Sequence, residues 1–182
     1  MSTTFNGKIS LDILFNEIIS DGNQKRGPIS SKFSVLVDLA TGTSDNQINV
    51  AYAKTETGIG AGVTTVYDLI GSLTSTDGTT LNFDEVVLVA VRNRSSTAAN
   101  FLKVGPDATN GFGVLAAPTA NLGFWADASD RNVIVADGYS WLVLHSKAGV
   151  PATAGATDEL AVITDASSSA NTWDIMILGR DN

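Results

Sequence analysis

Six apolar residues in an unbroken row, Val86-Val87-Leu88-Val89-Ala90-Val91, constrain the fold of this chain more than any other feature. The polar pair Asp84-Glu85 precedes the row, and Arg92-Asn93-Arg94 ends it. β-Branched side chains lose rotamer freedom in a helix, and a row this short between turn-forming residues is typical of a strand that is buried on both faces. The row therefore predicts a central strand of a packed β-structure.

Short strand patterns separated by turn formers recur along most of the chain. The steps Asp77-Gly78 and Asp137-Gly138 are strong hairpin signals. Residues 32–40 alternate between apolar and polar positions, residues 63–73 read as one further strand, and residues 173–178 form the last. No long helical pattern interrupts them, so residues 32–182 are predicted to form an all-β fold, an antiparallel β-sandwich.

Residues 1–31 form a distinct opening. The segment 11–20 fits an amphipathic helix only loosely and a strand only in its first half, and glycine and proline at 21–23 and 26–28 interrupt any regular element. We interpret residues 1–31 as an N-terminal arm that lies on its own domain or on a neighbour. The first strand of the sandwich is an equal alternative.

The composition favours a protein that is partly covered by others. The chain has 182 residues and no cysteine, which is long enough for one core without disulfides or a structural metal. Only 16% of its residues are charged, well below the usual quarter, which indicates a surface that other subunits cover or one that is compact and loop-rich.

The charge balance argues against two classes of partner. Residues 1–60 carry five basic and six acidic side chains, whereas residues 61–182 carry six and thirteen. Such an acidic excess disfavours nucleic acid. No apolar run is long enough to span a membrane and no signal-peptide pattern opens the chain, so we expect no membrane partner either.

Residue types that carry out catalysis are few. The single histidine, His145, lies in a predicted strand on the same face as Trp141 and Val143, with no second ligand or nucleophile motif beside it. Adjacent carboxylates such as Asp84 and Glu85 point to opposite faces of a strand and make no acid–base pair. We expect a non-enzymatic protein without a cofactor, and a hydrolase is a minor alternative.

A possible calcium site needs separate consideration. The segment Asp127–Asn132 is rich in oxygen ligands, but it lacks the alternating acids and the final glutamate of an EF-hand loop. Aspartates at such positions also form turns through their own side chains. The turn interpretation is favoured, and no metal site is predicted.

Three stretches carry a resemblance to a known group of proteins. They are FDEVVLVAVRNRSSTAANFLKVG at 83–105, ADASDRNVIVADGYSWLVL at 126–144 and ATDELAVITDASSSANTWDIMILGRD at 156–181. These stretches resemble small structural proteins of tailed-bacteriophage virions, and more narrowly the jelly-roll proteins that decorate or cement capsids, commonly as trimers. The resemblance covers about residues 68–180, and it departs from the group at Ala136-Asp137-Gly138, where similar sequences often have Pro-Gly-Gly.

The resemblance implies a jelly-roll decoration or cement protein on the capsid surface of a virion, made in the host cytoplasm. It would form a homotrimer, bind the major capsid protein and stabilise the shell. A neck or tail-fibre domain that binds a receptor glycan is the alternative. The candidate partner-binding residues lie in the arm, at the basic end of the central strand and in an aromatic loop: Phe5, Ile9, Leu11, Ile13, Leu14, Phe15, Arg92, Arg94, Phe124 and Trp125.

Overall fold

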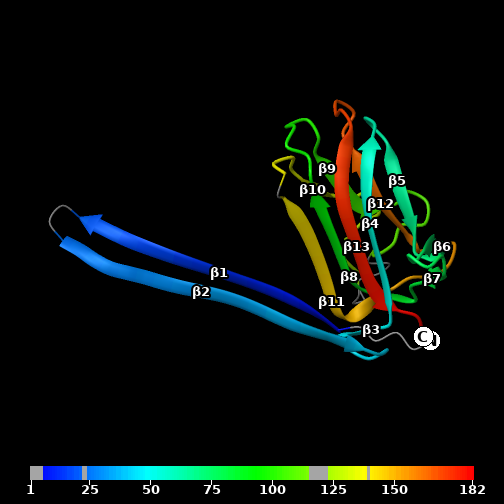
Figure 1. Cartoon of the computed structure of the whole chain (residues 1–182), viewed down its shortest axis with the longest axis horizontal. Coiled ribbons are helices and arrows are strands. Elements are labelled where there is room, and N and C mark those ends of the chain that lie inside the picture. Colours follow the sequence, from blue (N-terminus) through cyan, green and yellow to red (C-terminus); the bar gives the residue numbers. More distant parts are fainter. Residues whose placement is uncertain (1–5, 22–23, 115–122, 139) are drawn as a thin grey trace.

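Two four-stranded antiparallel sheets form a sandwich in the computed structural model, which describes residues 6–21, 24–114, 123–138 and 140–182 (Figure 1). In the first two strands, side chains are described at residues 7–10, 34 and 36–41. The predicted all-β sandwich is confirmed. Across the described part of the chain, no helix is long and apolar enough to span a membrane.

The first sheet, here called sheet I, contains the apolar row that opened the sequence analysis. Its strands in spatial order are β11 (Trp141–Pro151), β8 (Glu85–Asn93), β13 (Asn171–Arg180) and β4 (Val50–Ile59). The row lies in β8, which pairs with β11 on one side and β13 on the other. The central position predicted for this strand is therefore confirmed.

The second sheet, sheet II, packs against the first. Its strands in spatial order are β10 (Asn132–Ile134), β9 (Leu102–Pro106), β12 (Glu159–Thr164) and β5 (Thr64–Asp68). A small hairpin of β6 (Ile70–Thr74) and β7 (Thr80–Asn82) follows β5.

The strand expected over residues 63–73 is wrong as a single element, because the chain turns at Leu69. The Asp68 Oδ1 accepts a hydrogen bond of 3.0 Å from the Ile70 amide, which is the geometry of an aspartate turn. The Leu69 side chain is fully buried, and its amide donates to the Asp158 carbonyl. The turn therefore separates β5 in sheet II from β6 in the small hairpin.

The eight strands of the two sheets pair in a nested order. The first of them, β4, pairs with the last, β13; β5 pairs with β12, β8 with β11, and β9 with β10. Members of a pair lie in one sheet, and successive pairs alternate between sheets I and II. This is the strand order of a jelly roll, so the jelly-roll-like fold is the observed one.

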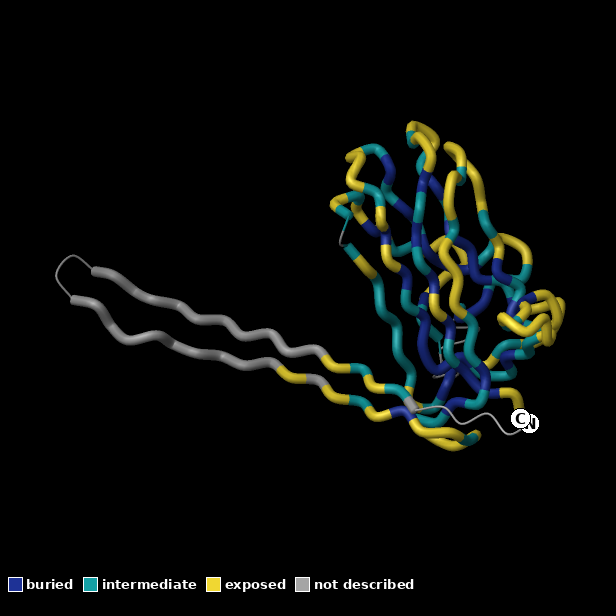
Figure 2. Tube along the Cα trace, in the orientation of Figure 1, coloured by how far each residue is buried: buried dark blue, intermediate teal, exposed yellow. Residues whose placement is uncertain are grey.

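The core fills the space between the two sheets, where Figure 2 shows the buried residues. Trp173 on β13 and Tyr67 on β5 are both buried in it, and the indole Nε1 donates a 3.0 Å hydrogen bond to the phenol oxygen. Because this bond joins sheet I to sheet II with both partners buried, it fixes the two layers relative to each other.

A long two-stranded ribbon precedes the sandwich. It consists of β1 (Asn6–Asp21) and β2 (Gln24–Thr41), and a short β3 (Gln47–Ile48) pairs with the end of β2. The ribbon extends away from the sandwich (Figure 1). Strand β2 crosses the boundary expected between residues 31 and 32, so residues 32–40 belong to the ribbon and not to either sheet.

Candidate interaction surface

The outer face of sheet I, which points away from the core, is mostly apolar. Its residues form three cross-strand rows from β11 through β8 and β13 to β4. The rows are Trp141–Arg92–Asp174–Thr55, Val143–Ala90–Met176–Ala53 and His145–Leu88–Leu178–Ala51. The solvent face of an antiparallel sheet normally carries polar residues, so two apolar rows out of three indicate a surface that a partner covers.

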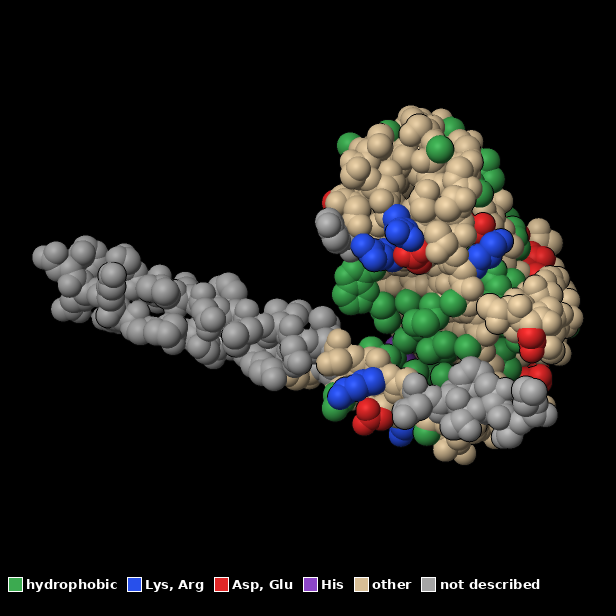
Figure 3. All heavy atoms as spheres, in the orientation of Figure 1, with side chains coloured by type: hydrophobic (Ala, Val, Ile, Leu, Met, Phe, Trp, Pro, Cys, Tyr) green, Lys and Arg blue, Asp and Glu red, His purple; other side chains and the backbone are tan. Residues whose placement is uncertain are grey.

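Large apolar side chains on this face are open to solvent. Trp141 is 58% exposed and Met176 is 39% exposed. Figure 3 shows hydrophobic side chains gathered on this side of the sandwich, between a group of charged side chains and the base of the ribbon. We call the two apolar rows the apolar face.

The charged border of the apolar face contains the basic residues predicted to bind a partner. Arg94 lies 3.3 Å from Asp174, which also accepts a 2.7 Å hydrogen bond from Thr55. Arg92 Nη2 donates to the Gly138 carbonyl at 3.4 Å, whereas Asn93 between the two arginines is fully buried. Arg94 thus has an acidic neighbour in the same chain, on β13.

The opposite border is a groove between the apolar face and the base of the ribbon. It has a volume of about 520 Å³. Lys8, Ile9 and Val37 line it from the ribbon, and Trp141, His145 and Met176 from sheet I. Of the arm residues predicted to bind a partner, Ile9 therefore lies at this groove. Leu11, Ile13, Leu14 and Phe15 lie farther out in β1, and Phe5 is outside the described residues.

His145 lies in the groove with one ring nitrogen unsatisfied. Its Nε2 is buried and has no hydrogen-bond partner among the described residues. Burial disfavours the imidazolium and lowers the pKa of His145 below its ordinary value. Lys8 is the one other titratable residue in the groove lining. Among the described lining residues, no carboxylate lies beside the imidazole.

The lowered pKa of His145 gives a testable dependence of stability on pH. As pH falls from about 7.5 to about 5.5, the unfolded chain takes up a proton at this residue more readily than the folded chain, so the free energy of unfolding decreases. The substitution His145→Gln should make this decrease smaller, as measured by urea unfolding across the range. Since the chain has no other histidine, equal decreases in the two proteins would contradict the expectation.

The aromatic loop predicted to bind a partner lies mostly in the core. Phe112 is fully buried and Trp125 is 4% exposed. Phe124 contacts both rings edge-on, with centroid distances of 6.0 Å to Phe112 and 5.7 Å to Trp125. Gly113 has a φ of +77°, and an added Cβ would meet the Trp125 ring at 2.9 Å. These aromatic residues pin the loop to the sandwich, and Trp125 offers no exposed ring for stacking.

The aspartates of the possible calcium segment form a turn. Asp130 Oδ2 accepts hydrogen bonds from the amides of Ala126 and Asp127, and Asp127 Oδ1 accepts one of 2.8 Å from the amide of Ser129. The hydrogen bonds from Ser129 lower the pKa of Asp127. No group of three potential metal-ligating side chains occurs in the described ranges.

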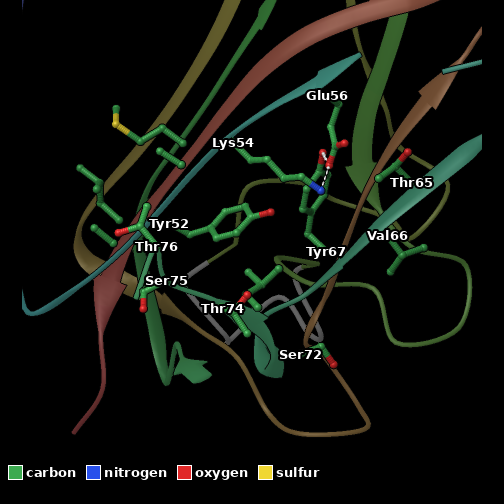
Figure 4. A pocket seen from close by; sticks show the side chains of 15 residues that line it. Tyr52, Lys54, Glu56, Thr65, Val66, Tyr67, Ser72, Thr74, Ser75 and Thr76 are labelled. Atoms are coloured by element: carbon green, nitrogen blue, oxygen red, sulfur yellow. Dashed lines mark hydrogen bonds and ion pairs between the residues drawn. The ribbon is translucent and has the colours of Figure 1, made fainter. Parts of the chain in front are cut away.

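A second hollow, about 560 Å³ in volume, lies at the edge of the sandwich where β4 faces β5 (Figure 4). Tyr52, Lys54 and Glu56 line it from β4, and Tyr67 from β5. Lys54 Nζ lies 2.9 Å from Glu56 Oε1, and this hydrogen bond raises the pKa of Lys54. Because the two charges neutralise each other, the hollow presents no net charge to a ligand.

Sequence reasoning found part of the apolar face and missed the rest. It placed Trp141, Val143 and His145 on one face of a strand, which the register of β11 confirms. It missed Ala53 and Ala90, because alanine carries little signal at any position. The apolar residues at both alternating positions of β13 were the available signal, since Met176 stands between two core isoleucines.

Comparison of the chain with known protein families, with curated proteins and with solved structures gives no match.

Proposed function

We propose that the chain is a non-enzymatic structural protein of a tailed-phage virion, which decorates the outer surface of the capsid and cements the shell. The observation that carries this proposal is the ribbon. A two-stranded hairpin is at best marginally stable in water by itself, so a ribbon that extends away from its own domain serves best as a contact arm. The resemblance of residues 68–180 to virion proteins supports a virion as the kind of assembly.

Cementing needs no chemistry beyond binding. A protein that binds the assembled shell and not the free capsid subunits stabilises the shell by mass action. The jelly-roll sandwich supplies a rigid body for this task, and the ribbon and the apolar face supply contact surfaces at one side of it. A homotrimer would present several such surfaces at once and gain avidity.

The alternative, a glycan-binding domain of a neck or fibre, has less support. It relied on the aromatic residues of the 105–131 loop, and Trp125 among them is only 4% exposed.

The proposal is tested with purified capsids of a phage that carries the gene. The purified chain should co-sediment with shells up to a saturating ratio and raise the temperature at which the shells release DNA. A matched variant replaces residues 10–36 by a short Gly-Ser turn and keeps Ile9 and Val37, which pack on the sandwich. Its apparent affinity for shells should fall by about tenfold or more, through lost avidity. Failure of the intact chain to bind shells would refute the proposal.

A further inference from the structure

The pairing of β1 with β2 gives the ribbon one apolar and one mixed, largely polar face. Directly paired residues lie on the same face of a two-stranded ribbon, and successive residues alternate between faces. The apolar side of the ribbon carries the paired positions Ile9–Val37, Leu11–Val35 and Ile13–Phe33. The other face carries the pairs Lys8–Asp38, Ser10–Leu36, Asp12–Ser34 and Leu14–Lys32. We call the first set the ribbon stripe.

The ribbon stripe already contacts sheet I at its inner end. Ile9 and Val37 pack with Leu39, and this group packs on Val87 and Leu178 of the sheet. Beyond these residues β1 and β2 continue away from the sandwich (Figure 1). The stripe therefore begins on the surface of its own domain and continues beyond it at the positions of Leu11 and Ile13.

The root of the ribbon is held so that it does not fold back. The Ala40 amide donates to the Asn46 carbonyl at 3.2 Å, and the Gly42 amide to the Ile48 carbonyl at 3.1 Å. The buried Arg180 donates a 2.6 Å hydrogen bond from Nη1 to the Ser44 carbonyl. These bonds hold the base of β2 to the sandwich, and the row of the apolar face that contains Met176 stays open to solvent.

We propose that the ribbon stripe of one chain covers the apolar face of a second copy of the same chain. Both surfaces are apolar. In the apolar face, the row of Met176 is open to solvent, whereas Leu178 in the next row already packs with the ribbon of its own chain. The stripe packs on this very sheet within one chain, and a second copy offers the adjoining rows of the same sheet. The contact therefore continues an interface that the chain already makes.

The ribbon is longer than sheet I is wide. The twelve residues from 10 to 21 of β1 span about 40 Å at about 3.3 Å per residue. Four strands spaced about 4.8 Å apart give a sheet less than about 20 Å wide. One ribbon is therefore long enough to cross the whole apolar face of a neighbour. Each chain can donate one ribbon and accept one, which gives a mutual exchange between two chains, or a ring where the rotation between neighbours closes.

Cysteine pairs test the contact directly, because the chain has no cysteine of its own. One sample carries Ile13→Cys and another Met176→Cys; the two are mixed, allowed to exchange subunits and oxidised. A disulfide-linked dimer of one variant with the other is expected. The matched control pairs Ile13→Cys with Val133→Cys, an apolar residue of sheet II that is 58% exposed, and should give no such product.

A charge on the apolar face provides the second measurement. Met176→Asp should weaken self-association by about tenfold or more, because the carboxylate would be buried without a partner. Val133→Asp should leave it unchanged. Sedimentation velocity measures association, and circular dichroism checks that both variants are folded. A monomeric wild type at micromolar concentration, or equal yields of the two cysteine pairs, would overturn the inference.

The inference does not rest on the virion role, since these measurements use purified protein alone. An oligomer linked from ribbon to sheet that binds no capsid would keep the inference and refute the proposed function. A monomer that binds capsids, with its ribbon on another protein, would refute the inference and keep the proposed function.

Discussion

Replacing Trp173 by alanine is expected to lower the free energy of unfolding by about 3–5 kcal/mol, the largest effect of a single substitution in this chain. The Trp173 side chain is fully buried in the core. Its removal leaves a cavity between the sheets, and it deprives the buried Tyr67 hydroxyl of the 3.0 Å hydrogen bond from the indole. Urea unfolding followed by circular dichroism measures the change.

The control for this prediction uses the same residue type in another environment. Trp141 is 58% exposed, so Trp141→Ala should cost less than about 1 kcal/mol. Both substitutions are best made in the chain with the shortened ribbon, which lacks the contact between copies that we propose. Similar losses for the two tryptophans would contradict the assignment of Trp173 to the junction of the sheets.

Replacing Glu85 by alanine is expected to lower the free energy of unfolding by about 3 kcal/mol, because the buried guanidinium of Arg180 loses its charged partner. Arg180 Nε lies 2.7 Å from Glu85 Oε2, and the side chains are 3% and 31% exposed. The geometry at Nε is that of an ion pair and not of a hydrogen bond. The two terminal nitrogens of Arg180 donate to the carbonyls of Ser44 and Ala148, so the guanidinium has no room to turn toward water.

Two further variants separate charge from packing at this position. Adding Arg180→Met to Glu85→Ala should restore part of the lost stability, since the unpaired charge is then removed. Arg94→Ala breaks an ion pair whose side chains are 49% and 36% exposed, and it should cost no more than about 1 kcal/mol. If the double variant is no more stable than Glu85→Ala, the loss does not come from a stranded charge. Position 149 requires glycine, because φ is +78° there and an added Cβ would collide with the Arg180 guanidinium.

The layers of the fold could be predicted from the sequence because they depend on local patterns. The valine-rich row became β8, and residues 173–178 lie in β13. The partner of each strand could not be predicted in this way. Residues 32–40 alternate as a strand of a sheet would, yet they pair with β1 in the ribbon. An alternating pattern shows that one side of a strand is apolar, but it does not show which element covers that side.

The candidate surface was predictable only in part for the same reason. Ile9 and the shared face of Trp141 and His145 follow from the spacing of residues within single strands. The apolar face is formed by four strands in register, and these strands are separated from one another in the sequence. Trp125 shows the opposite error. An aromatic residue in a loop-like stretch suggested a binding site, but tertiary packing buries this residue in the core.

The nested pairing of the jelly roll sets an order of events during synthesis. The ribbon pairs neighbouring segments, so it can form early, whereas β4 must wait for β13, the last strand of the chain. Met176 and Leu178 of the apolar face belong to β13. If the ribbon of one chain covers the apolar face of another, as proposed above, an incomplete chain can donate a ribbon but cannot receive one. The contact would then select finished subunits, which would give the assembly a built-in check on the integrity of its parts.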